Sequence, residues 1–305
     1  MRGYVVLLGI LAASWGASYL FIKVAVEDLE PAPMMCLRLI LAFAALFPVL
    51  ALSSGPGGAV TAIKETGRGG ALLGLINMAI PFTLIAWGEK HIDSGVAAIA
   101  NSTVPIFVAL LAIRFRPSER VTGMRMFGIL LGLLGVGVLT GLNPEGGWWA
   151  IAGTLAVVLA SLSYACANLY APARFGRTEP LVVATATIFW GMVLLIPFSL
   201  FQLPDQMPGW KALASVAALG LIGTAFATLI LYRMLNTYGA SRTSLVTYLL
   251  PPMALLYGVT ILGEEIHLNA ALGLVLILAG VALGSGLLQL ARGRRDEPAP
   301  ATPRA

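Results

Sequence analysis

The chain has 305 residues, of which 58% are hydrophobic and only 11% are charged, and its mean hydropathy is +0.89. A soluble domain carries about 25% charged residues, so this composition excludes an ordinary water-soluble body and predicts a surface in contact with lipid. The net charge of +5 would suit nucleic acid, but the basic residues stand at the ends of apolar runs, which indicates membrane topology instead.

Ten runs of the chain are long enough to cross a membrane, which takes about 20 mostly apolar residues. The first begins at Tyr4 and has no small-residue cleavage site, so we expect it to be retained as a span. The links are short, except for a Gly-rich polar link over 53–70, and the charged tail 292–305 is expected to be disordered and cytoplasmic. The expected spans cover 4–24, 34–53, 70–88, 93–113, 123–142, 148–170, 180–201, 211–232, 240–262 and 268–290.

Positive charge predicts that both termini are cytoplasmic. With the N-terminus inside, fifteen of the nineteen Lys and Arg residues fall on the cytoplasmic side. Lys23, Lys90 and Lys211 fall on the outer side, and Arg38 lies within the second span. A split this uneven also favours an even number of spans.

The second half of the chain repeats the first at an offset of about 149 residues, which places Trp15 on Tyr164 and, at a slightly shorter offset, Pro105 on Pro251. Five crossings are an odd number, so the second repeat enters the membrane from the opposite side. We therefore expect an all-α integral membrane protein of ten helices, built as two inverted five-helix repeats, 1–143 and 144–291. Inverted repeats are typical of transporters that bind substrate near the midplane, and alternating access follows as a hypothesis.

Polar and aromatic residues lie on defined faces of spans that the repeat relates: the first with the sixth, the third with the eighth, and the fourth with the ninth. Hydroxyl residues often do no more than pack between helices, whereas a buried Asn or Tyr in lipid needs a partner or a hydrated cavity. We therefore expect a central cavity. The candidate substrate-binding residues are Trp15, Ser18, Tyr19, Thr83, Trp87, Asn101, Ser102, Ser163, Tyr164, Asn168, Thr228, Tyr232, Thr247 and Tyr248.

Proline and glycine mark where these spans bend or touch. Pro81, Pro105 and Pro251 remove backbone donors and are expected to kink the third, fourth and ninth spans, either as hinges or as static bends. Gly132 and Gly280 belong to Gly-rich fifth and tenth spans, where small residues allow close helix contact. Those spans are expected to form a structural seam or a dimer face.

No Asp or Glu falls at the centre of an expected span, so we expect a pH gradient to matter little. Arg38 is expected to snorkel outward or to pair with an acidic residue of the 27–30 link. Two cysteines and two histidines show no ligand spacing, so no metal or cofactor is expected. Four carboxylates near span ends are expected to be solvated loop charges: Glu89, Asp93, Glu264 and Glu265.

The residues resemble the drug/metabolite transporter superfamily, in particular its EamA-type ten-helix members, and within them the YddG-type exporters of amino acids and other metabolites. The resemblance implies a cavity lined by the first, third, fourth, sixth, eighth and ninth spans. The third span ends Ala86-Trp87-Gly88, where many members have tyrosine. The resemblance is carried by Trp15-Gly16-Ala17-Ser18 with Lys23, by Pro31 and Arg38, by Pro105, and by the Pro117-Ser118-Glu119 and Gly263-Glu264-Glu265 links.

We therefore expect a multi-pass transporter of the bacterial inner membrane, not an enzyme, that exports small amphiphilic metabolites, with amino acids as the first candidate. We expect a monomer or weak homodimer that binds a small-molecule substrate and the lipid bilayer, and no nucleic acid. Cationic drugs would also suit the aromatic lining, whereas nucleotide sugars or phosphorylated metabolites would need basic residues in the cavity. A membrane enzyme would need a cluster of His, Asp or Glu that the sequence does not display.

Overall fold

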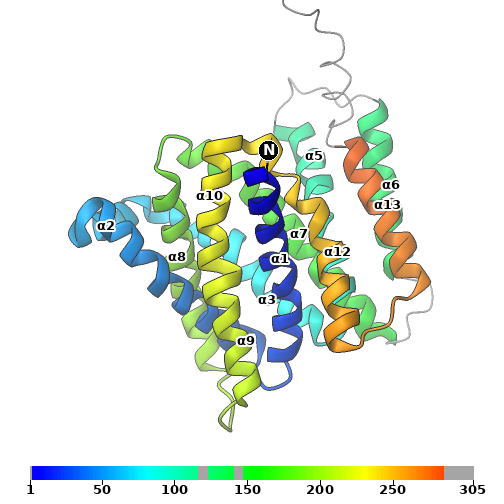
Figure 1. Ribbon diagram of the computed structural model, residues 1–305, viewed down its shortest axis with the longest axis horizontal. Coiled ribbons are helices and arrows are strands. Elements are labelled where there is room, and N and C mark those ends of the chain that lie inside the picture. The colour runs from blue at the N-terminus through cyan, green and yellow to red at the C-terminus, as the bar shows by residue number, and fades with distance from the viewer. Residues whose placement is uncertain (1, 116–122, 141–146, 285–305) are drawn as a thin grey trace, which may run out of the picture.

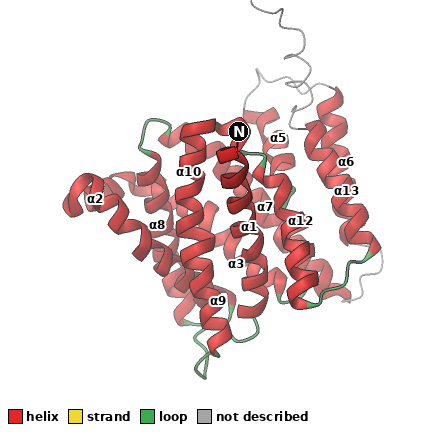
Figure 2. Ribbon diagram, viewed as in Figure 1, coloured by secondary structure: helices red, strands yellow, loops and turns green. Residues whose placement is uncertain are grey.

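The computed structural model describes residues 2–115, 123–140 and 147–284. These residues form helices joined by short turns, and no strand occurs among them (Figure 2). The expected repeat boundary at 143/144, the Pro117-Ser118-Glu119 link and the tail 292–305 lie outside the described residues.

The helices pack as a bundle, with α2 at one edge and α6 beside α13 at the other (Figure 1). The first half of the chain forms α1 (Arg2–Ala25), α2 (Pro31–Gly74), the π-helical segment η1 (Leu75–Ala79), α3 (Ile80–Glu89), α4 (Ser94–Asn101), α5 (Val104–Phe115) and α6 (Gly123–Thr140). The second half forms α7 (Gly147–Phe175), α8 (Pro180–Leu200), α9 (Trp210–Gly220), the π-helical segment η2 (Leu221–Phe226), α10 (Ala227–Tyr238), α11 (Ala240–Thr243), α12 (Val246–Tyr257), the π-helical segment η3 (Gly258–Leu262) and α13 (Leu268–Gly284).

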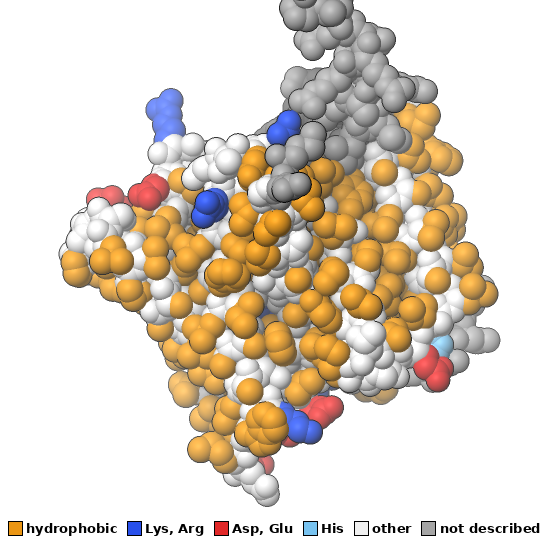
Figure 3. All heavy atoms as spheres, in the orientation of Figure 1, with side chains coloured by type: hydrophobic (Ala, Val, Ile, Leu, Met, Phe, Trp, Pro, Cys, Tyr) orange, Lys and Arg blue, Asp and Glu red, His pale blue; other side chains and the backbone are white. Residues whose placement is uncertain are grey.

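Six helical stretches of the described chain are long and apolar enough to cross a membrane, and three shorter apolar helices accompany them. Figure 3 shows hydrophobic side chains over the broad middle of the visible face and charged side chains near its margins. An all-helical bundle with this surface fits an integral membrane protein. The long stretches are Gly3–Ala25, Pro31–Glu89, Ser94–Ala112, Gly147–Phe175, Pro180–Leu200 and Trp210–Tyr238, and the shorter ones are Met126–Leu139, Val246–Leu262 and Leu268–Leu283.

The segment over 53–70 differs from the expected polar link. It is helical, and the helix is interrupted at Gly55 (φ 72°) and Gly67 (φ 50°), conformations that glycine adopts without a steric penalty. Between these breaks, Ala59 and Ile63 are buried in an apolar cluster that also contains Leu50. The polar composition of the segment concealed this apolar helical face.

Two of the three candidate hinge prolines coincide with a break or change in the helix. Pro105 lacks the N–H that would bond to the carbonyl of Asn101, and α4 ends at Asn101 while α5 begins at Val104. Pro81 lies in the first turn of α3, directly after η1. Pro251 lies inside an unbroken α12, and the ninth expected span is interrupted earlier, between α11 and α12. A hinge role for these prolines stays a prediction.

The Gly-rich helices α6 and α13 form a close seam within one chain. A Cβ atom at Gly280 would lie 2.5 Å from the backbone nitrogen of Gly132, and one at Gly273 would lie 3.1 Å from the carbonyl oxygen of Gly135. Because only glycine permits this approach, the seam is a structural contact of the fold.

The end of the bundle opposite the N-terminus, called the far end below, gathers three links, 26–30, 90–93 and 201–209 (Figure 1). Lys90 Nζ and Glu30 Oε1 form an ion pair of 2.7 Å. The backbone N–H of Gly209 donates to Asp28 Oδ2 at 2.8 Å. These contacts hold α1, α3 and α9 together at that end.

Candidate substrate cavity

A cavity of about 530 Å³ lies among helices from both halves of the chain. Toward the N-terminal end its lining reaches Leu73, Ala171 and Leu235. Toward the far end it stops at Ile22 of α1 and Ile85 of α3. The cavity therefore extends toward the N-terminal end of the bundle and is closed at the far end.

Ten of the fourteen candidate residues line this cavity, although they come from elements far apart in the sequence. Their side chains are aromatic or neutral and polar, so they offer π faces and hydrogen-bonding groups rather than charge. The ten are Trp15, Ser18, Tyr19, Asn101, Ser102, Tyr164, Asn168, Thr228, Tyr232 and Thr247, and the candidate hinge Pro105 lines the cavity with them.

Two of the other four candidates, Thr83 and Ser163, use their hydroxyls on the backbone outside the cavity lining. Thr83 Oγ1 donates to the carbonyl of Ala79 at 2.8 Å, within its own helix. Ser163 Oγ donates to the carbonyl of Ile76 in η1 at 2.7 Å. A π-helical turn disturbs the regular ladder of backbone hydrogen bonds. The Ser163 hydroxyl binds a carbonyl of that turn and thereby joins α7 to η1.

The remaining two candidates, Trp87 and Tyr248, also lie outside the cavity lining. The ring centroids of Trp87 and His91 are 4.7 Å apart, and His91 stacks on Trp149 of α7 at 5.1 Å. Tyr248 is half-buried and packs against the main apolar core. The structure places these four residues outside the cavity lining, and a substrate contact for them stays a prediction.

The cavity also includes residues of two helices that neither the polar stripes nor the resemblance assigned to it. From α2 comes Arg38, and from α8 come Val183, Ala184, Thr187 and Ile188. In the sequence, the only indication that the second expected span contributes to the cavity was Arg38, a basic residue inside that span. The α8 lining is almost entirely apolar, so its sequence resembles that of any lipid-facing helix.

Arg38 is buried, with 5% of its surface exposed. Its Nε donates to Thr224 Oγ1 at 2.9 Å, its Nη1 lies 3.8 Å from Met35 Sδ, and its Cζ lies 3.9 Å from the centroid of the Phe82 ring. Among the described residues, no carboxylate lies within 4.0 Å of this guanidinium. A cation therefore lines the cavity with a neutral hydroxyl, a thioether and an aromatic ring as its neighbours.

The expected pairing of Arg38 with the 27–30 link is wrong. Glu30 of that link pairs instead with Lys90, and Asp28 accepts a hydrogen bond from the backbone of Gly209. These two acids therefore bind partners at the far end. The Arg38 guanidinium points into the bundle, where it contacts Thr224 and Phe82. Snorkelling toward the membrane surface is excluded by its burial.

Asn101 joins three helices beside the cavity. Its Nδ2 donates to the hydroxyl of Tyr19 on α1 at 2.8 Å, and its Oδ1 accepts from Ser161 Oγ on α7 at 3.1 Å. The same Ser161 hydroxyl lies 3.4 Å from the carbonyl of Ala100, near the end of α4. The break before Pro105 thus frees backbone groups that side chains satisfy in the apolar interior.

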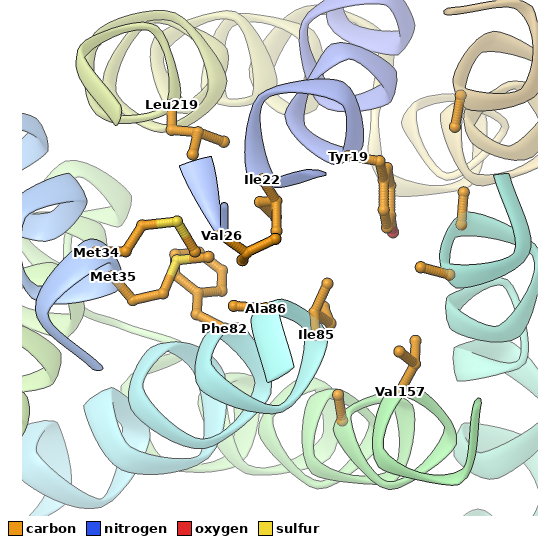
Figure 4. Packing of buried hydrophobic residues seen from close by; sticks show 14 of the residues in the cluster. Tyr19, Ile22, Val26, Met34, Met35, Phe82, Ile85, Ala86, Val157 and Leu219 are labelled. Carbon is orange, nitrogen blue, oxygen red and sulfur yellow. The ribbon is translucent and has the colours of Figure 1, made fainter. Parts of the chain in front are cut away.

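Apolar side chains and one lysine close the far end of the cavity. Figure 4 shows Ile22 of α1 and Val26 of the following turn opposite Phe82, Ile85 and Ala86 of α3, all within the main buried core. Directly after Ile22, Lys23 Nζ donates to the carbonyls of residues 89 and 92, at 2.9 and 2.7 Å. Lys23 therefore binds the C-terminal end of α3, where the helix dipole favours a cation.

Two of the four carboxylates expected to be solvated are not. Glu89 has no exposed surface, and neither of its carboxylate oxygens accepts a hydrogen bond. Glu264 Oε1 accepts from the N–H of Ser94 at 2.8 Å, and Glu264 Oε2 accepts from Ser94 Oγ at 2.8 Å and from the N–H of Gly95 at 3.2 Å. Glu264 thereby caps α4 from the second half of the chain. Glu265 is exposed, as expected.

The profile of the EamA-like transporter family matches residues 2–141 and 151–286. The chain belongs to this family. It is 27% identical over 273 residues to the "Uncharacterized inner membrane transporter YedA" of Escherichia coli, covering 88% of this chain and 86% of that protein. It is also 27% identical over 299 residues to the "Probable terminal-alkyne amino-acid exporter" of Streptantibioticus cattleyicolor, covering 95% of each.

A solved crystal structure matches this EamA-like chain with a TM-score of 0.64 at 20% identity, covering 94% of this chain and 99% of the other. At that identity the match shows the fold alone. The family profile and the names of the relatives are those of transporters rather than enzymes. The resemblance to EamA-type members of the drug/metabolite transporter superfamily is therefore confirmed.

Proposed function

We propose that this EamA-like transporter exports small amphiphilic metabolites that bear a carboxylate, with amino acids as the first candidates. The observation that carries the proposal is Arg38, a guanidinium that lines the cavity with no carboxylate of the described chain within 4.0 Å. A cation in the membrane interior is costly without a partner. A substrate carboxylate would supply that partner through charge-assisted hydrogen bonds.

The aromatic lining supplies the complementary half of an amino acid site. Trp15, Tyr19 and Tyr164 line the same cavity as Arg38, and aromatic faces bind ammonium groups. A purely cationic drug would meet the positive charge of Arg38, which argues against that alternative. A phosphorylated metabolite shares the anion chemistry and remains the second candidate. At about 530 Å³, the cavity has the size typical of small-molecule sites.

We further infer that transport proceeds by alternating access in ten helices, arranged as two inverted repeats, with both termini in the cytoplasm of a bacterial cell and the bundle in its inner membrane. The two ranges matched by the family profile, 2–141 and 151–286, support two repeats. The name of the Escherichia coli relative supports the inner membrane. With the termini inside, the present conformation faces the cytoplasm, since the cavity extends toward the N-terminal end.

Counterflow of radiolabelled amino acids into proteoliposomes tests this function. The purified full chain should exchange at least one amino acid, and Arg38→Met should slow that exchange by about 10- to 100-fold, because a hydrogen bond to a charged group contributes about 1.5–3 kcal/mol. Arg233→Met, on an exposed face of α10, is the matched control and should exchange at the parent rate.

Competition by three ligand types then separates the substrate classes. The unlabelled amino acid should compete, its decarboxylated amine should not, and a sugar phosphate competes only if the phosphate alternative is correct. Exchange of every amino acid at the rate of empty liposomes would refute the proposed function. An Arg38→Met variant as active as the parent would refute the assigned role of Arg38.

A further inference from the structure

We propose that Glu89 is a proton-binding site that holds the far end of the cavity closed, so that transport depends on the pH of the solution at that end. The proposal rests on the proposed function in one respect, because it requires the far end to open during the transport cycle. It goes beyond that function, since it concerns the ion that controls the opening and not the substrate.

The first observation is the burial of an acid that accepts no hydrogen bond. Glu89 is the last residue of α3, has no exposed surface, and presents two carboxylate oxygens that accept no hydrogen bond. An ionised carboxylate in such a place would lose its hydration without gaining a hydrogen bond or an ion pair. Buried groups avoid this cost by taking the neutral form. In this conformation Glu89 therefore carries a proton.

Among the described residues, no neighbouring cation forms an ion pair that would stabilise an ionised Glu89 carboxylate. The ammonium of Lys23 on α1 is bound to the backbone carbonyls of residues 89 and 92 and forms no ion pair with the carboxylate. From α7, Gly153 and Val157 pack on Gly88, and neither titrates. The charged or titratable groups that act on Glu89 from neighbouring elements are Lys23, Arg38, Glu264 and Tyr19, and those in the following turn are Lys90, His91 and Asp93.

Opening the far end would change the surroundings of both Glu89 and Lys23. The floor of the cavity consists of Ile22 and Ile85, so opening it separates α1 from α3. That movement breaks the two hydrogen bonds from Lys23 and brings Glu89 to water. There the carboxylic acid releases its proton to the solution, and the resulting carboxylate lies beside the freed ammonium of Lys23. Binding of a proton reverses these steps and favours closure.

The sign of the pH dependence follows from this scheme. A proton that binds only the closed far end shifts the ratio of open to closed molecules by up to about tenfold per pH unit, toward open as the pH rises. The expectation that pH matters little rested on the absence of Asp and Glu from the centres of the expected spans, with Glu89 expected to be a solvated loop charge. Its burial removes that assumption.

Cysteine accessibility measures this ratio without a substrate. The native Cys36 and Cys166 are replaced by Ala, and Ile85→Cys places a thiol on the cavity floor. A membrane-impermeant maleimide is applied to the far side of oriented membrane vesicles between about pH 5 and about pH 8. Each rate is divided by that of Met207→Cys, which is 89% exposed in the far-end link and corrects for the reactivity of the thiol itself.

The normalised labelling of Ile85→Cys should rise with pH by up to about tenfold per unit. Adding Glu89→Gln, a neutral group of the same shape, should abolish the rise and leave labelling low throughout. Asp205→Asn, which removes an exposed carboxylate in the far-end link 201–209, should preserve the rise. The proposal would be overturned if labelling of Ile85→Cys did not change with pH while Glu89 is present. It would also be overturned if labelling rose equally with pH in the Glu89→Gln variant.

Failure of this proposal is distinguishable from failure of the proposed function. Labelling needs no amino acid, so a pH-dependent rise that requires Glu89 stands even if the substrate is a different compound. Conversely, amino acid counterflow with pH-independent labelling refutes the proton site alone. Labelling of Ile85→Cys from the N-terminal side verifies that Glu89→Gln is folded, and Glu89→Met serves as the neutral variant if it is not.

Discussion

Arg38 and Asn101 are both polar side chains deep in the bundle, but their contacts give them different tasks. Asn101 uses its amide on two protein partners, Tyr19 and Ser161, and so connects helices. Arg38 makes one strong hydrogen bond, from its Nε to Thr224, and its guanidinium carries further N–H donors where it lines the cavity. A side chain whose donors and acceptors are satisfied by the protein contributes to stability, and one with free donors is available to a ligand.

Replacing Asn101 should therefore cost stability. Asn101→Ala removes the donor to the buried Tyr19 hydroxyl and one of three acceptors near Ser161 Oγ. We expect a loss of about 1–3 kcal/mol, measured as a lower melting temperature in detergent. Asn236→Ala, on an exposed position of α10, should leave the melting temperature almost unchanged. Equal melting temperatures for the two variants would show that the Asn101 contacts do not stabilise the protein.

Ten of the fourteen residues chosen from the sequence line the cavity, because Asn and aromatic residues in mid-span need polar surroundings. Thr83 and Trp87 lie outside the lining because another face of α3 meets the cavity. Phe82 and Ile85, spaced by three residues, line the cavity, and the polar pair lies on a neighbouring face. Hydroxyl groups also bond to the backbone of their own helix, as Thr83 does, so their polarity does not show which face meets the substrate.

At the scale of helices, periodicity and length predicted the elements well, and local breaks were predicted less well. Most expected spans correspond to helices of the structure, and the interruption before Pro105 follows from the missing backbone donor. The π-helical segments η1, η2 and η3 were not foreseen, since a single extra residue in a turn leaves no pattern in composition. The helix between Gly55 and Gly67 was hidden by its polar residues.

The seam between α6 and α13 supports a prediction in which two glycine substitutions have opposite effects. Gly280→Ala would place a Cβ atom 2.5 Å from the backbone of Gly132, and forcing the helices apart should cost about 1–3 kcal/mol. Gly137→Ala meets no atom within 4 Å and should be neutral or stabilising by up to about 1 kcal/mol, because alanine favours helices. Melting temperatures in detergent compare them. A Gly280→Ala variant as stable as the parent would show that the seam tolerates separation.

At the scale of the whole molecule, the bundle has two chemically different ends. The far end is closed by apolar packing, Lys23 and the ion pair between Lys90 and Glu30. The N-terminus lies at the other end (Figure 1). The lining residues Leu73, Ala171 and Leu235 extend the cavity toward that end. Charge counting in the sequence assigned these ends to opposite sides of the membrane.

Cysteine labelling in intact cells tests that assignment. In the background lacking Cys36 and Cys166, Met207→Cys at the far end should react with an impermeant maleimide added outside. Arg177→Cys, exposed in the turn between α7 and α8, should react only after the cells are permeabilised. Reaction of Arg177→Cys in intact cells, with protection of Met207→Cys, would reverse the predicted topology.

The cap that Glu264 places on α4 also bears on the order in which the protein matures. Ser94 and Glu264 are separated by 170 positions along the chain, so the ribosome completes α4 long before it adds the carboxylate that binds its first turn. Until residue 264 has been added, the amide groups at the start of α4 lack this cap. The first turn of α4 therefore gains this cap only after the second half of the chain has been synthesised as far as residue 264.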